Sequence, residues 1–161
     1  MQDSLKVLRV RAGGRDFALD VGVVRAIERP AHRVRLPGAP PYVRGVVEVR
    51  GQAVAVVDLA ARLGLTAQGG ADPAVVVVDS LEPVGLSVEA LGDVAAVAPE
   101  SLVDLGPRGH AAGLRARAPD GTVVLEVEPL VDGRPLEPAA AVLDGGGERE
   151  GRPEGPDEER P

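Results

Sequence analysis

The chain has 161 residues, of which 44% are hydrophobic but only 1% aromatic, and it contains no cysteine. This length fits one domain or two small subdomains that share a core, and the lack of cysteine excludes disulfides, thiol catalysis and Cys-ligated metals. The net charge of −7 is uneven, because residues 1–64 carry 11 Lys/Arg against 6 Asp/Glu whereas residues 65–161 carry 7 against 19.

Valine supplies much of the apolar content, with 27 residues, and 21 glycines and 15 prolines punctuate the chain. β-Branched side chains pack well on a pleated surface, and frequent Gly and Pro mark turns. The composition therefore predicts an all-β fold of many short strands, a barrel or a sandwich.

The first 65 residues are expected to form two hairpins and a short helical segment. Gly13-Gly14 and Gly51-Gln52 supply the tight turns, since glycine accepts the positive φ that such turns need. Residues 21–28 have apolar spacings that fit either a strand or a helix, and a proline-rich segment over residues 35–45 is expected to be extended. Residues 59–63 read as one or two helical turns closed by Gly64. The expected strands are residues 5–11, 16–19, 46–50 and 53–58.

The second half begins after a loop over residues 66–73, which is the best internal boundary. Four consecutive valines at 75–78 predict a strand buried on both faces. We expect a short helix at "PESL", a loop at "GPRGHAAG" and a short terminal helix from Pro129. The expected strands are residues 74–79, 84–89, 90–97, 114–118 and 122–128. Residues 144–161 carry almost no apolar side chain, which predicts a disordered acidic Gly/Pro/Glu-rich tail.

Side chains suited to catalysis are scarce. His32 and His110 lie in predicted loops without a second ligand at metal-binding spacing, and no serine stands in Gly-x-Ser-x-Gly. Glu126 and Glu128 would share one face of a strand, where acidic surface residues are common. We expect neither an enzyme nor a bound cofactor or metal.

The sequence also predicts where the protein does not act. The basic first half lacks aromatic platforms for stacking bases, so nucleic-acid binding is not expected. The N-terminus does not resemble a signal peptide, and no apolar stretch reaches the roughly 20 residues needed to span a bilayer. We therefore expect a soluble cytoplasmic protein without direct membrane insertion.

An ordered set of motifs resembles the CheW-like coupling proteins of bacterial chemotaxis. The strongest are "PPYVRGVVEVRG" and "AVAVVDLAARLGL", and weaker ones lie upstream in "LKVLRVRAGGRDFALDVGVVRAIE" and downstream in "AVVVVDSLEPVGLSVEALGDVAAVAPESL" and "HAAGLRARAPDGTVVLEVEPLV". The resemblance implies a single domain over residues 1–143. It would hold two intertwined SH3-like five-stranded barrels, the first over roughly residues 15–70 and the second over roughly residues 71–136 with the N-terminal strand.

The resemblance further implies a scaffold with no activity of its own. Such a protein would couple chemoreceptor cytoplasmic tips to the regulatory domain of a CheA-type histidine kinase, in arrays at the membrane that hold other CheW-like domains. One alternative is an adaptor of the same fold that serves pilus motility or development, or that regulates a kinase without receptors. The other is a ligand-binding or hydrolytic β-barrel.

We expect the partner to dock in an apolar groove with a basic rim, since helices dock most readily in apolar grooves. About half of the groove valines are expected to be core instead. Glu28 is hypothesised to pair with Arg50, because Ala26 stands where many members of the family carry a glutamate that braces this arginine. The candidate residues are Val24, Ile27, Val46, Val54, Val56, Arg44, Arg50 and Glu28.

Overall fold

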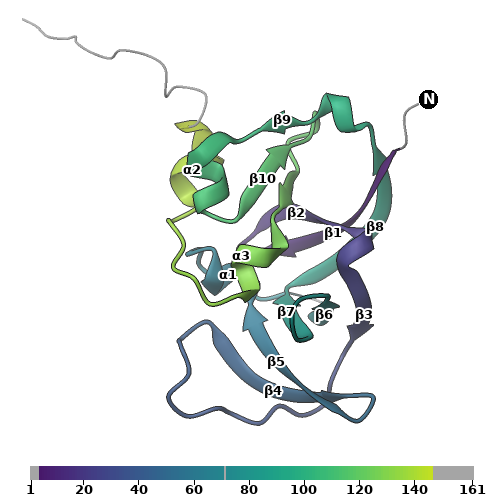
Figure 1. The fold of residues 1–161 in the computed structure, drawn as a ribbon, viewed down its shortest axis with the longest axis vertical. Coiled ribbons are helices and arrows are strands. Elements are labelled where there is room, and N and C mark those ends of the chain that lie inside the picture. Colours follow the sequence, from purple (N-terminus) through teal and green to yellow (C-terminus); the bar gives the residue numbers. More distant parts are fainter. Residues whose placement is uncertain (1–3, 71, 147–161) are drawn as a thin grey trace, which may run out of the picture.

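The computed structural model describes residues 4–70 and 72–146, which form two β-sheets with short helical segments between them (Figure 1). The first two strands, β1 (Leu5–Ala12) and β2 (Arg15–Asp20), form the expected hairpin. The remaining elements are η1 (Val21–Val23), β3 (Val24–Glu28), β4 (Val43–Val49), β5 (Gln52–Asp58), α1 (Leu59–Arg62), β6 (Ala74–Val78), β7 (Val84–Val88), β8 (Ala90–Val97), η2 (Pro99–Ser101), β9 (Val103–Asp104), α2 (Gly106–Ala111), β10 (Leu114–Arg117), β11 (Val123–Leu125), α3 (Val127–Val131) and η3 (Val142–Gly146).

The chain enters one sheet, crosses to the other and returns. One sheet has six strands in the order β8-β1-β2-β11-β10-β9, and the other has five in the order β3-β6-β7-β5-β4. The pairs β2–β11 and β5–β7 are parallel. These pairings confirm an all-β fold of two interlocked sheets with short helical turns. One sheet has six strands instead of five, because the two-residue strand β9 pairs with β10.

The strands divide between the sheets differently from the expected boundary at residues 70/71. β6 and β7 join β3, β4 and β5, whereas β2 stays with β1. The parallel partner of β5 is β7, which lies beyond the predicted boundary loop. Each sheet is therefore assembled from segments on both sides of that loop.

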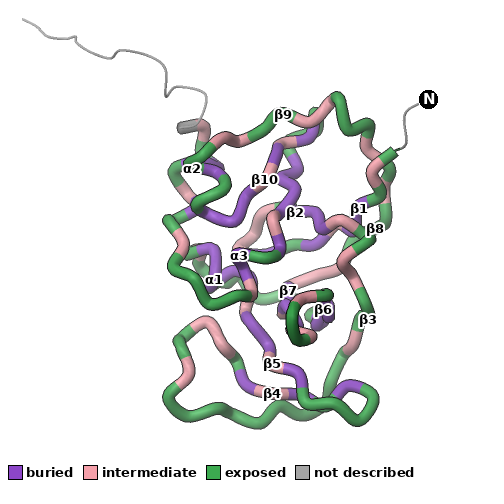
Figure 2. The backbone as a smooth tube through the Cα atoms, in the orientation of Figure 1, coloured by how far each residue is buried: buried purple, intermediate pink, exposed green. Residues whose placement is uncertain are grey.

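The described residues form three apolar clusters. The largest lies between the two sheets and also takes in side chains of α1 and α3. A cluster of six valines from β4, β5 and β6 lies on one face of the five-stranded sheet, and a smaller one of Val7, Ala18 and Val124 lies on one face of the six-stranded sheet. All five residues of β6 are buried, which confirms the strand predicted to be covered on both faces; Figure 2 shows it in purple.

Several local expectations are corrected. The segment expected as a loop forms α2, with Pro107 in its first turn, where the missing proline N–H costs nothing. β11 ends at Leu125 and Glu128 belongs to α3, so Glu126 and Glu128 do not share a strand face. Of the expected tail, Asp144 lies within η3, and its Oδ1 accepts a hydrogen bond from Arg15 Nη2 at 2.8 Å. Residues 147–161 lie outside the described residues. No helix in the described ranges has the length and apolar character required to cross a membrane.

Candidate protein-interaction surface

The β3–β4 connector, residues 29–42, arches over the valine-lined face of the five-stranded sheet and encloses a hollow of about 1090 Å³. The connector runs along the bottom of Figure 1 and is largely exposed in Figure 2. Buried Val47, Val56 and Val75 back the floor of the hollow, while connector residues and Arg44 form its walls. The hollow is about four times as large as a second one of about 270 Å³ on the other sheet. It shares Val56 and Arg44 with the groove expected from the sequence.

Contacts fix the connector at its start and at its middle. At its start, Arg29 donates from Nε and Nη2 to the two carboxylate oxygens of Asp72 at 3.0 and 2.9 Å. This hydrogen bonding lowers the pKa of Asp72. At its middle, Val34 exchanges two backbone hydrogen bonds with Val46 of β4, at 2.9 and 2.8 Å. The connector is therefore held against the edge strand β4 by one isolated β-bridge.

Arg44 is aimed by an irregularity in β4. The register between β4 and β5 shifts between Val43 and Gly45, which leaves Arg44 as the extra residue of a bulge. Its Nε donates to Asp58 Oδ2 at 2.8 Å, and its Nη2 contacts the same oxygen. The other oxygen, Asp58 Oδ1, accepts from the Ala61 N–H at 3.1 Å and caps α1. Asp58 therefore caps α1, as predicted, and the same carboxylate orients Arg44 in the wall of the hollow.

Arg50 stands at the tip of the β4–β5 hairpin in an unusual backbone conformation. Its φ is +52°, followed by Gly51 at +80°, as a two-residue type I′ turn requires. It is the one non-glycine residue with positive φ in the described ranges. Such a conformation costs a residue with a Cβ roughly 1–2 kcal/mol. The Arg50 side chain is exposed and forms no ion pair with any described residue.

The other candidate residues separate onto different faces. Val54 and Val56 are 1% and 0% exposed and belong to the valine cluster on one face of the five-stranded sheet. Val56 backs the floor of the hollow, whereas Val54 is not among the residues that line it. Both valines fall on the same face of β5 because alternate residues of a strand point the same way. Val46 pairs with Ala55 on the opposite face and is half-buried.

Val24 and Ile27 share a face of β3 but differ in burial. Val24 packs against the central cluster, whereas Ile27 is 40% exposed. A bulge shifts the register of β3 between Val24 and Ala26. Val24 therefore pairs with Val78 and Ile27 with Val76, which places both side chains on the same face of the sheet. Glu28 is half-buried on the edge of the sheet, and no hydrogen bond or ion pair joins it to Arg50 among the described residues. The hypothesised Glu28–Arg50 brace is therefore absent.

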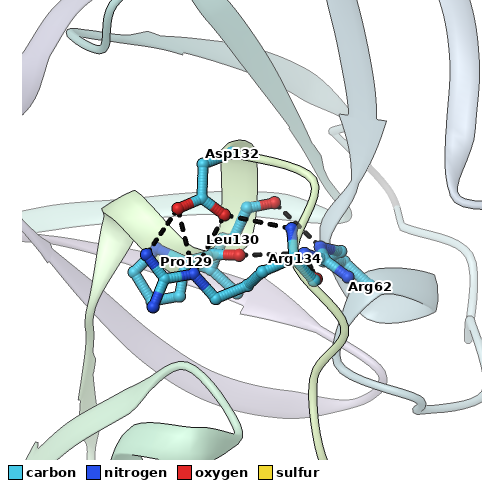
Figure 3. Close-up of polar contacts among 5 residues, drawn as sticks. All are labelled: Arg62, Pro129, Leu130, Asp132 and Arg134. Carbon is cyan, nitrogen blue, oxygen red and sulfur yellow. Dashed lines mark hydrogen bonds and ion pairs between the residues drawn. The ribbon is translucent and has the colours of Figure 1, made fainter.

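Arg62 is a central residue that the sequence did not single out. Only 7% exposed, it reaches from α1 to the chain around the end of α3 (Figure 3). Nε donates to the Leu130 carbonyl and Nη2 to the Pro129 carbonyl, each at 2.9 Å, and Nη2 also contacts the Arg134 carbonyl. The guanidinium carbon lies 4.4 Å from the ring centre of Tyr42. Arg62 thus joins the end of the connector to the segment that follows α3.

His110, in α2 beside the six-stranded sheet, lies between the carboxylates of Asp104 and Glu126. His110 Nε2 lies 3.1 Å from Asp104 Oδ1, and its Nδ1 lies 3.9 Å from Glu126 Oε1. The Gly106 N–H, and then His110, hold the pKa of Asp104 below its ordinary value. Within residues 4–70 and 72–146 no group of three His, Cys, Asp or Glu side chains is arranged to hold a metal.

Comparisons with known proteins agree with this architecture. A profile described as the CheW-like domain matches residues 6–133. Chemotaxis protein CheW of Bacillus subtilis is 37% identical over 60 residues, which cover 37% of this chain and 38% of that protein. Its counterpart in Rhizobium meliloti is 36% identical over 62 residues, covering 38% and 40%. The aligned segment thus spans well under half of the length of these relatives.

A solved structure shares the fold. The scaffolding protein TtCheW from Thermoanaerobacter tengcongensis superposes with a TM-score of 0.74 at 21% sequence identity, covering 83% of this chain and 98% of that one. The profile match extends over most of the chain and includes both sheets, from β1 to the end of α3. The chain belongs to the CheW-like domain family.

Proposed function

We propose that this protein is a non-enzymatic adaptor that couples chemoreceptor cytoplasmic tips to the regulatory domain of a CheA-type histidine kinase. Family membership supports the class of protein, and the names of its relatives support chemotaxis as the process. Its site of action would be the cytoplasmic face of receptor arrays, where other CheW-like domains are further partners.

One observation carries the proposal to a particular surface, namely the backbone strain at Arg50. Glycine or asparagine would occupy this turn position at lower cost, yet the chain places an exposed arginine without an ion pair there. Strained residues on a rigid scaffold are typical of functional surfaces. Arg50, exposed Ile27 and half-buried Val46 would form the contact area, with Arg44 on its rim and Val54 and Val56 as the wall behind it.

The mechanism requires rigidity and no chemistry. An adaptor transmits a signal when binding free energy at one contact biases a second contact. β6 is buried on both faces, and Arg62 joins the two halves of the chain. A receptor rearrangement would therefore displace the domain as one body.

The test is an affinity measurement with the receptor cytoplasmic fragment and the kinase regulatory domain encoded in the same genome. Arg50→Glu should weaken binding to at least one partner by about tenfold, or ~1.4 kcal/mol, with an almost unchanged melting temperature. Arg50→Asn is the matched control for backbone conformation, because asparagine tolerates positive φ. If the wild-type protein binds neither partner, the proposed function is refuted. If Arg50→Glu unfolds the protein, Arg50 is a structural residue.

A further inference from the structure

The hollow beneath the β3–β4 connector is uniformly basic in a chain that is acidic overall. Every ionisable side chain that lines it is cationic or imidazole, namely His32, Arg33, Arg35 and Arg44, whereas the net charge of the chain is −7. Arg44 is already bound by Asp58. Arg33 and Arg35 have neither an ion pair nor a side-chain hydrogen bond with any described residue. Two exposed guanidinium groups are thus left without a carboxylate partner.

The backbone directs both arginines into the hollow. Val34 is held in an extended bridge to Val46, so the residues on either side of it point to the opposite face. Arg33 and Arg35 line the hollow, whereas Val34 does not and is 68% exposed. Leu36, 47% exposed, also lines the hollow and adds an apolar contact beside the charges.

Gly45 makes this arrangement possible. A Cβ on Gly45 would lie 2.3 Å from the Val34 carbonyl oxygen, and its φ is +135°. The connector also carries prolines at 30, 37, 40 and 41, which fix φ and lower the entropy lost on binding. The two arginines are therefore presented from a stiff segment before any partner arrives.

We propose that the hollow binds an acidic segment of a partner protein, whose carboxylates pair with Arg33 and Arg35 while Leu36 packs against its apolar side chains. The proposal rests on the proposed function, since the segment belongs to a protein that docks on this sheet. Arginine binds carboxylates through two parallel hydrogen bonds, and the free guanidinium pair gives the charge complementarity.

A protein segment fits these observations better than a nucleic acid. Single-stranded nucleic acids are bound by basic grooves that also offer aromatic rings for stacking. Phe17 is 0% exposed, and the Tyr42 ring is covered by the Arg62 guanidinium. The described residues therefore offer no free aromatic platform near the hollow.

The decisive experiment exchanges charge on both sides of the contact. Two fluorescent amphipathic peptides share the same leucines and carry either glutamates or lysines, and their affinities are measured by anisotropy. The wild-type protein should bind the glutamate peptide, and more weakly as salt rises. Arg33→Glu/Arg35→Glu should lose this affinity by at least about tenfold and gain affinity for the lysine peptide. Arg11→Glu/Arg15→Glu, on the β1–β2 hairpin, makes the same change in net charge and should bind like the wild type.

The remaining outcomes separate the two proposals. Equal loss in both double variants, or tighter binding of a single-stranded RNA oligonucleotide than of the glutamate peptide, would overturn the inference. So would unchanged affinity of Arg33→Glu/Arg35→Glu for the receptor fragment and the kinase domain, although the adaptor function would then stand. If the wild type binds the glutamate peptide but neither protein, the adaptor function fails and the acidic-segment site remains.

Discussion

Replacing Arg62 should destabilise the protein far more than replacing a surface arginine. Arg62→Met removes the donor from the carbonyls of Pro129, Leu130 and Arg134. The first two are among the last carbonyls of α3, which have no further helical turn to bond them. Leaving a buried acceptor unpaired costs about 1–3 kcal/mol, so three acceptors with partial access to water give a loss of about 3 kcal/mol. The lost contact with Tyr42 acts in the same direction.

Two opposing effects decide whether Arg62→Met raises or lowers the free energy of unfolding. Burying a guanidinium costs several kcal/mol, so exchanging a whole buried ion pair for apolar residues is often neutral. In Arg62→Met, however, the acceptors belong to the backbone and remain in place. The buried charge is relieved, but the carbonyls lose their donor. Destabilisation therefore wins.

Urea unfolding followed by far-ultraviolet circular dichroism measures the effect. With a slope of about 2 kcal/mol per molar urea, a loss of 3 kcal/mol lowers the midpoint by about 1.5 M. Arg62→Lys should fall between Met and the wild type, because an ammonium cannot reproduce the guanidinium fork. Arg134→Met is the matched control, since it removes an exposed side chain and leaves the Arg134 carbonyl available. A midpoint for Arg62→Met within 0.3 M (~0.6 kcal/mol) of the control would refute the reasoning.

The elements that the sequence predicts best are those that a few neighbouring residues specify. The valine run of β6 is buried along its length, and Asp58 followed by Leu59 marks the start of α1. In both cases neighbouring residues carry enough information, through burial on two faces or through a cap. The glycines of the first hairpin likewise have the positive φ expected of its turn.

The errors arise where long-range pairing decides. The parallel pairs β2–β11 and β5–β7 join segments that are distant in sequence, and no local pattern indicates which sheet receives β6 and β7. Both faces of β5 carry small or branched apolar residues, so the sequence did not show that Val54 and Val56 point inward. The burial of Arg62 was equally hidden, because an arginine in a short helix is exposed by default.

Three further substitutions test the surface and the fold. Asp58→Ala removes both the cap of α1 and the hydrogen bond from Arg44. It should lower the free energy of unfolding, measured in urea, by about 2 kcal/mol. A loss below about 0.5 kcal/mol would show that the cap is dispensable. The Thr122 N–H holds the pKa of Asp120 below its ordinary value, so the stabilisation is present above about pH 4 and is lost as the pH falls through the folded-state pKa. Asp120→Asn should therefore lower the melting temperature at pH 6 and narrow the gap to the wild type at pH 3, and equal gaps at both pH values would contradict this. Gly45→Ala should break the Val34 bridge, because the new Cβ would lie 2.3 Å from a carbonyl oxygen. Gly38→Ala carries a similar positive-φ strain with nothing within 4 Å, so faster amide exchange at Val34 and weaker binding of the glutamate peptide should appear in Gly45→Ala alone. Equal loss of binding in both variants would mean that strained backbone in the connector region is enough to weaken binding. The bridge between Val34 and Val46 would then not be what positions the two arginines.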